Sequence, residues 1–223
     1  MFIVVSGNVN ADHVLELCDR YLKDPPPVTV ETMPYNEPQE VVCDYKEQPM
    51  SVSLPQFIWG IKLDCEGYLP LKNRTEISMI LSAFLGQQSP LYNQLLKEGL
   101  INKSFGVSLF DGRNFACILF SGESSDPKLV VEKIKTALSE LQQKGIDPQE
   151  FELIRRQFYG RYLMSFNNVE GIGDALTDCA CDNSDLFDEA RIFANVTVND
   201  LNERLLSDFK AERSALSVVL PNK

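Results

Sequence analysis

Hydrophobic residues in this 223-residue chain follow two patterns, and the first predicts strands. Short runs rich in β-branched and aromatic residues, continuous or alternating with polar residues, are typical of strands in a sheet. Such runs occupy residues 2–6, 41–45, 56–63, 105–109, 115–120 and 216–220. Asp111-Gly112 separates two of these runs and predicts a tight turn between antiparallel neighbours.

Hydrophobic residues spaced three or four apart form the second pattern and predict helices. Helices are expected at 10–23, 70–85, 89–96, 126–145, 185–194 and 197–209, and a long helix from 147 past Phe158. Ser89-Pro90, Asp126-Pro127 and Asp147-Pro148 are typical helix starts, because a side-chain oxygen can accept from the first backbone N–H groups and proline suits the first turn.

The order of these elements predicts the fold class and divides the chain into three parts. Residues 41–223 are expected to form an α+β domain with helices packed on one face of a mostly antiparallel sheet. Prolines and glutamates are frequent in residues 25–40, which indicates a linker. A strand and a helix alone cannot bury a core, so residues 1–24 are interpreted as the end of a preceding domain.

The two ends of the chain contain similar sequences. Phe2-Ile-Val-Val-Ser-Gly-Asn8 and Leu216-Ser-Val-Val-Leu-Pro-Asn222 are both hydrophobic strand candidates that end in a turn-forming pair. If each is the last strand of a domain, the longer protein is a tandem of two similar domains.

Composition and charge exclude some functions. Hydrophobic residues make up 44% of the chain, which is ordinary for a globular protein, and no hydrophobic run is long enough to span a bilayer. The formal net charge of −11 disfavours nucleic acid and anionic membranes as partners, and it leaves a basic or unfolded peptide open. Solubility in the cytoplasm of a bacterium would explain the same charge.

The six cysteines are scattered without a C-x-x-C pair, which is typical of reduced structural thiols in a reducing compartment. Cys117 lies in a hydrophobic run and is expected to be buried. Cys179 and Cys181 have no histidine or second cysteine cluster near them, so a metal site or redox pair is disfavoured.

Residues for catalysis are largely missing from the sequence. His13 is the one histidine, and it begins the segment His13-Val-Leu-Glu-Leu17. In the zinc motif H-x-x-E-H a second histidine stands where this chain has Leu17, and leucine cannot bind a metal. The pair Gly171 and Gly173 is interpreted as a bend or as close helix packing rather than a phosphate site, and the acidic stretch 178–188 as a solvated loop.

Several segments in a fixed order resemble a known family. They are the strand-to-helix join at 2–15, the proline-rich linker, Gln56-Phe-Ile-Trp-Gly-Ile-Lys62, and the segments 85–100, 145–150 and 196–200. Together they make the chain similar to the C-terminal half of an insulinase/pitrilysin-type zinc peptidase, the superfamily that includes the mitochondrial processing peptidase. The chain looks most like bacterial two-domain processing proteases.

The resemblance implies a role without chemistry of its own. In that family a first domain carries the zinc motif, and a second domain without metal closes the other wall of a peptide-holding chamber. Residues 41–223 would be that second domain, so no catalytic residue and no metal ligand is expected here. Zinc would belong to the longer protein, a zinc metalloendopeptidase, and this chain alone would be inactive. Its partners would be the N-terminal catalytic domain of the same longer chain and a peptide substrate, with a homodimer or heterodimer left open.

The resemblance also suggests two peptide-binding positions. Many relatives carry an arginine and a tyrosine seven residues apart that contact the bound peptide. Aligning Gly99-Leu100 with the glycine and leucine of that motif places Leu95 at the arginine and Asn102 at the tyrosine. Leucine has no hydrogen-bond donor and asparagine has neither the reach nor the ring, so this chain departs from the family at both positions.

Two other functions remain open at this point. A zinc-free scaffold or assembly subunit of a heterodimeric peptidase-like complex would show the same features. An unrelated α+β binding domain would explain the element order but not the ordered set of family segments.

Overall fold

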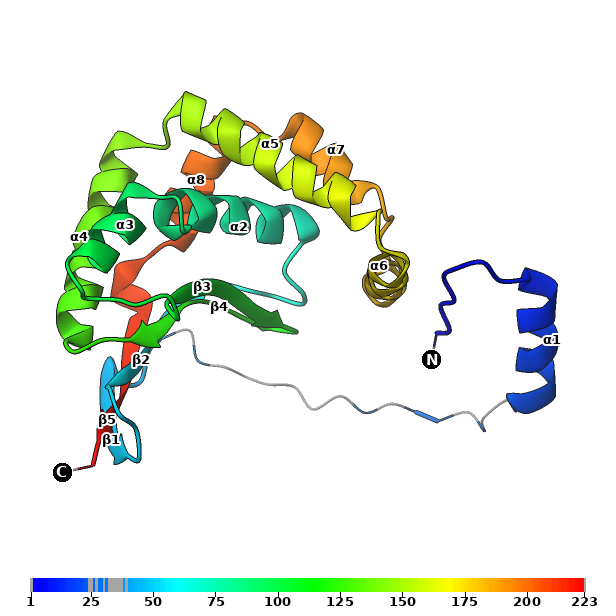
Figure 1. Cartoon of the computed structure of the whole chain (residues 1–223), viewed down its shortest axis with the longest axis horizontal. Helices are drawn as coiled ribbons and strands as arrows, with labels where there is room; N and C mark the ends of the chain where they lie inside the picture. The colour runs from blue at the N-terminus through cyan, green and yellow to red at the C-terminus, as the bar shows by residue number, and fades with distance from the viewer. Residues whose placement is uncertain are drawn as a thin grey trace.

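The computed structural model describes residues 2–23, 26, 28–29, 31, 38 and 40–222. Figure 1 shows two regions, which we name the arm (residues 2–23) and the main domain (residues 40–222). The main domain has two layers, a sheet and a group of helices over one of its faces (Figure 1). This arrangement confirms the predicted α+β class.

The strands that the structure describes form one mixed sheet of five, in the order β1-β5-β2-β4-β3. Their bounds are Tyr45–Met50 (β1), Gln56–Leu63 (β2), Gly106–Gly112 (β3), Phe115–Glu123 (β4) and Ser214–Pro221 (β5). Strand β1 pairs with β5 in parallel, whereas every other pairing is antiparallel. The sheet is therefore mostly antiparallel, as the element order predicts.

Side-chain burial alternates along the central strands and shows which face the helices cover. In β2 the buried residues are Phe57, Trp59, Ile61 and Leu63, with more exposed residues between them. The same alternation occurs in β4 and β5. Because successive side chains of a strand point to opposite faces, one face packs against the helices and the other is open. We call the second one the open face.

The helical layer follows the predicted pattern closely. Its helices are α2 (Leu71–Leu85), α3 (Pro90–Lys97), α4 (Pro127–Lys144), α5 (Pro148–Ser165), α6 (Val169–Asp182), α7 (Asp188–Asn195) and α8 (Val198–Asp208). Ser89, Asp126 and Asp147 accept backbone N–H hydrogen bonds at the starts of α3, α4 and α5, which confirms the predicted caps. Helix α2 lies in the middle of the layer, with Ile77, Met79 and Ile80 fully buried.

Two of the predicted strands differ from the structure. The run at 41–45 is not a strand, and β1 begins at Tyr45 and continues through polar residues to Met50. Residues 2–6 are not a strand either, although they are rich in valine and isoleucine. A strand is stabilised by hydrogen bonds to a neighbour, and no described strand pairs with residues 2–6.

Three smaller predictions, for Cys117, for the acidic stretch 178–188 and for Gly173, can also be compared with the structure. Cys117 is only half-buried because it lies between Ala116 and Ile118, which point to the core. The acidic stretch 178–188 is not all loop, since α6 extends to Asp182. Gly173 is in close contact with the arm rather than with another helix, because a Cβ atom there would lie 2.7 Å from Ser6 Oγ, and Ser6 is not part of a helix.

The arm touches the main domain at α6. Ser6 Oγ donates a hydrogen bond to the carbonyl oxygen of Val169 at 2.8 Å. Helix α1 (Ala11–Tyr21) follows, and none of its residues is buried. Leu15 and Tyr21 are 62% and 71% exposed, so its hydrophobic side is largely uncovered. No described helix is long and hydrophobic enough to span a membrane.

Candidate functional site

The open face has a hollow near one end of β2, β4 and β5. Its volume is about 370 Å³. The floor includes Ile58 and Val219, whose neighbours in the strands point to the core. The polar residues of its lining are Gln56, Ser104, Ser121, Glu123 and Ser217. A hydrophobic floor with a few polar groups around it is typical of a binding surface rather than a core.

Asn102 lies beside this hollow. Its side-chain Nδ2 donates a hydrogen bond to Glu123 Oε2 at 2.8 Å. Its Oδ1 accepts one from the backbone N–H of Ser104 at 2.8 Å. Gln56 Nε2 donates to the other oxygen, Glu123 Oε1, at 3.4 Å. The Glu123 carboxylate is thus held between two amides, and Asn102 is joined to two residues of the hollow.

A glycine makes this arrangement possible. A Cβ atom at position 122 would lie 3.1 Å from the Cα of Phe105, which is tighter than ordinary packing. Gly122 therefore lets the segment before β3 lie against β4. That approach brings Asn102 and Ser104 next to Glu123.

Leu95 lies elsewhere. It is on α3, it is fully buried, and it belongs to the hydrophobic core. Its side chain lies beneath the surface and does not line the hollow. Leu95 and Asn102, the two positions matched to the family motif, therefore do not meet at the hollow. Peptide contact by Asn102 stays a prediction.

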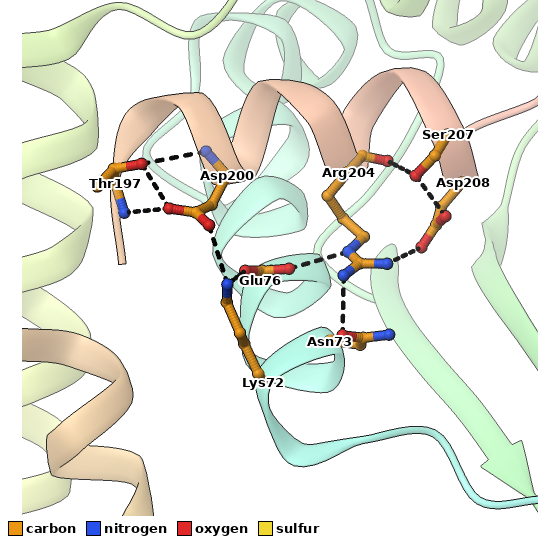
Figure 2. Close-up of polar contacts among 8 residues, drawn as sticks. All are labelled: Lys72, Asn73, Glu76, Thr197, Asp200, Arg204, Ser207 and Asp208. Atoms are coloured by element: carbon orange, nitrogen blue, oxygen red, sulfur yellow. Dashed lines mark hydrogen bonds and ion pairs between the residues drawn. The ribbon is translucent and has the colours of Figure 1, made fainter. Parts of the chain in front are cut away.

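A polar network between α2 and α8 supports the position of β5. Figure 2 shows the two helices side by side with Arg204 of α8 facing α2. Arg204 Nε contacts Glu76 Oε2 at 2.9 Å, and its Nη2 donates to Asn73 Oδ1 at 2.8 Å. Glu76 is 1% exposed, so this charge is paired inside the protein. Because β5 follows α8 closely in the chain, fixing α8 helps to fix the strand that lines the hollow.

A second ion pair extends this network. Lys72 Nζ lies 2.9 Å from Asp200 Oδ1 and 3.4 Å from Glu76 Oε1 (Figure 2). Asp200 also accepts hydrogen bonds from Thr197 in a capping box at the start of α8. The Thr197 hydrogen bond and Lys72 together lower the pKa of Asp200 to about 2.

The described residues do not fit a zinc site. No group of three or more His, Cys, Asp or Glu side chains among them is placed to hold a metal ion. His13 lies on α1 with its side chain 65% exposed, and its Nδ1 is 3.8 Å from Glu16 Oε2. A lone imidazole beside one carboxylate lacks the ligand number that zinc requires.

The turn at Asn102 to Ser104, which borders the hollow, could be predicted from the sequence. Asn102-Lys-Ser104 is a typical turn in which an asparagine side chain bonds the backbone two residues later, and Asn102 was singled out by the family match. Gln56 and Glu123 could not be assigned to the same place, because their contact depends on the register of β2 and β4.

A helix-backed, mostly antiparallel sheet of this kind is the fold of M16-like peptidase half-domains, on whose solved structures the chain superposes. The family model described as the Peptidase M16 inactive domain matches residues 1–158. The chain therefore belongs to the M16 inactive-domain family, which confirms the resemblance in its sequence.

Individual relatives agree with this assignment. The uncharacterized zinc protease YmfH of Bacillus subtilis is 25% identical over 188 residues, which cover 83% of this chain and 44% of YmfH. A structure described as an M16-like peptidase from Alicyclobacillus acidocaldarius superposes with a TM-score of 0.86 at 24% identity, over 97% of this chain and 53% of that one. The inactive peptidase domain of a Bordetella parapertussis protein described as a zinc protease gives a TM-score of 0.64 at 14% identity, over 79% and 95% of the two chains. This chain thus spans about half the length of the first two.

Proposed function

We propose that this chain is the non-catalytic C-terminal half of a zinc-dependent peptidase and that its open face forms one wall of a chamber that holds peptides. The zinc ligands would lie outside these residues, in a catalytic domain of the same longer chain or of a partner. The whole protein would be a zinc metalloendopeptidase, whereas this chain alone would cleave no peptide. Its location in the cytoplasm stays a prediction.

The hollow on the open face carries the proposal. The open face leaves Ile58 48% and Phe110 58% exposed, so hydrophobic side chains on it are available for contact with a ligand. Beside Ile58, the amides of Gln56 and Asn102, the Glu123 carboxylate and serine hydroxyls gather at one end. Such a mixture can hydrogen bond a peptide backbone and accept small hydrophobic side chains.

Blocking the hollow tests this proposal. Ser217 lines the hollow and is exposed, so Ser217→Arg should fold normally and fill the space. Ser139→Arg, on the exposed side of α4, adds the same charge away from the hollow and is the matched control. Binding of a fluorescein-labelled, unstructured decapeptide to the 223-residue chain should weaken about tenfold in Ser217→Arg alone, as expected when about 1.4 kcal/mol of contact is lost. Equal binding by both variants would contradict the proposal.

A zinc-free scaffold subunit of a heterodimeric peptidase-like complex is the alternative, and the same open face would then receive a partner subunit. The sequence of the longer protein separates the two. An H-x-x-E-H motif on the N-terminal side of these residues supports the peptidase, and a first domain without that motif supports the scaffold.

A further inference from the structure

A larger hollow lies in the helical layer, among α2, α5, α6 and α7. Its volume is about 700 Å³, and every residue that lines it belongs to these helices or to the loops that join α5 to α6 and α6 to α7. Figure 1 shows α6 at the C-terminal end of α5, crossing below it. No strand residue takes part, so this hollow is separate from the open face and from the function proposed for it.

One wall of the helical hollow is aromatic. Phe158, Tyr162, Phe166 and Phe193 all line it. The rings of Tyr162 and Phe166 meet edge to face at 5.0 Å, and those of Tyr162 and Phe193 at 6.2 Å. Tyr162 also donates its hydroxyl hydrogen to the carbonyl oxygen of Leu186 at 3.2 Å, which fixes the ring. The wall is therefore a preformed set of ring surfaces.

The lining is also acidic. Asp178, Asp182, Asp185 and Glu189 belong to it, together with the two guanidinium groups of Arg74 and Arg161. Asp182 pairs with Arg74 at 3.2 Å, and Asp185 lies 3.8 Å from Arg191. Four carboxylates against two guanidiniums leave an excess of two negative charges in the lining.

Glu189 is the least satisfied of these carboxylates. It is half-buried, and it accepts no hydrogen bond and forms no ion pair with any residue in the described part of the chain. Burial raises the pKa of its carboxyl group. A half-buried carboxylate without a partner is costly, and a cation beside it would relieve that cost.

The rim shows that an aromatic ring here can carry a cation. The guanidinium of Arg161 lies 5.6 Å from the centre of the Phe158 ring. A positive charge over an aromatic face is attracted by the ring, more strongly when water is excluded. Elsewhere in the lining, the Glu189 carboxylate and the rings of Tyr162, Phe166 and Phe193 offer the same two interactions.

We propose that the helical hollow binds the side chain of an arginine or lysine residue of a peptide. Such a side chain has a hydrophobic stem that would pack against the rings and a cationic head that would reach Glu189. An anion would meet the excess of carboxylates, and a purely hydrophobic group would leave Glu189 without a partner. The net charge of −11 would attract a basic peptide over a longer range.

The test compares three labelled hexapeptides that differ only at a central arginine, citrulline or norleucine in an alanine background. Fluorescence anisotropy with the 223-residue chain gives the affinities at low salt. The arginine peptide should bind about tenfold more tightly than either of the others. In Glu189→Gln this preference should fall to about twofold or less, whereas Glu203→Gln, an exposed change of equal charge on α8, should keep it.

Three results would overturn the proposal. They are equal affinity for the arginine and citrulline peptides, tighter binding of the norleucine peptide, and an unchanged preference in Glu189→Gln. Thermal unfolding of both variants checks that they are folded. The comparison of the three peptides uses the unmodified protein, so it does not depend on how any variant folds. Ser217→Arg should not alter the arginine preference, so failure here is distinct from failure of the chamber-wall function.

Discussion

Two regions with similar sequences have different structures. Residues 2–5 of the arm read Phe-Ile-Val-Val, and residues 216–219 in β5 read Leu-Ser-Val-Val. Strand β5 pairs with β1 on one side and β2 on the other, and its Leu216 and Val218 are buried. Residues 2–5 have no strand partner within the described chain, and Phe2 and Ile3 are more than half exposed. The comparison shows that strand-forming residues become a strand only where neighbours complete their hydrogen bonds.

The largest loss of stability is expected when a charge is placed in β5, the buried one of these two segments. Val218→Asp places a carboxylate at a position that is 3% exposed, beside Phe57. We expect the free energy of unfolding to fall by about 4 kcal/mol or more, because an unpaired charge is buried and hydrophobic contact is lost. Urea denaturation measures the change.

The matched variant in the arm is Ile3→Asp. Ile3 is 52% exposed, so the same kind of change should alter unfolding by less than about 0.5 kcal/mol. A loss as large as that of Val218→Asp would mean that the arm is part of the main core.

The ion pairs of the two regions differ in the same way. Arg204 pairs with the buried Glu76, whereas Arg20 in α1 lies 3.3 Å from Glu16 with both side chains exposed. Arg204→Ala should cost about 3 kcal/mol, because it removes the closest partner of a buried carboxylate. Arg20→Ala should cost less than about 0.5 kcal/mol.

A double variant sharpens this prediction. Combining Arg204→Ala with Glu76→Gln should cost less than the sum of the two single changes, since neither charge is then left alone. Strict additivity in urea denaturation would show that the pair is not coupled.

A smaller effect is expected from acid. The pKa of Asp200 is about 2 in the folded protein, below its ordinary value of 3.8. A lowered pKa means that the folded state binds its proton less readily, so the stabilisation is complete above pH 4 and is lost as the pH falls towards 2. Asp200→Asn should remove on the order of 1 kcal/mol at pH 7, after allowance for solvent screening, and flatten the decline between pH 4 and 2. The same decline in both proteins would contradict this assignment.

The smallest effect on the main domain should come from removing the arm. Deleting residues 1–24 removes the Ser6 hydrogen bond to Val169 and a helix with no buried residue. The melting temperature should change by about 4 °C or less, which corresponds to at most about 1 kcal/mol. Because the exposed hydrophobic residues of the arm can associate with one another, any self-association seen by light scattering should decrease. An unfolded deletion variant would place the arm in the core.

Much of this fold was predictable because local signals agree with the final structure. The caps Ser89, Asp126 and Asp147 each start a helix where the sequence indicates one. Strand β1 was missed because Lys46, Glu47 and Gln48 give it no hydrophobic pattern, and its extended form depends on β5. The strand predicted at 2–6 is the opposite case, a strong local pattern without a partner.

The two hollows were harder to predict than the helices. Asn102 was indicated by its place in the family motif, but its contact with Glu123 depends on the close approach at Gly122. Glu189 and Tyr162 are far apart in the sequence, and they line one hollow only because α5, α6 and α7 pack together. Pairings of this kind depend on tertiary structure, which periodicity and spacing do not specify.

The position of β5 has a consequence for how the protein is made. Among the described strands β5 comes last in the sequence, yet in the sheet it lies between β1 and β2, the first two strands of the main domain. During synthesis β1 therefore has no neighbour, and one side of β2 is open, until residues 214–221 leave the ribosome. Contacts between positions so far apart in the sequence also form slowly. The nascent chain should thus depend on chaperones until β5 is made, and deletion of residues 214–221 should yield an aggregating product.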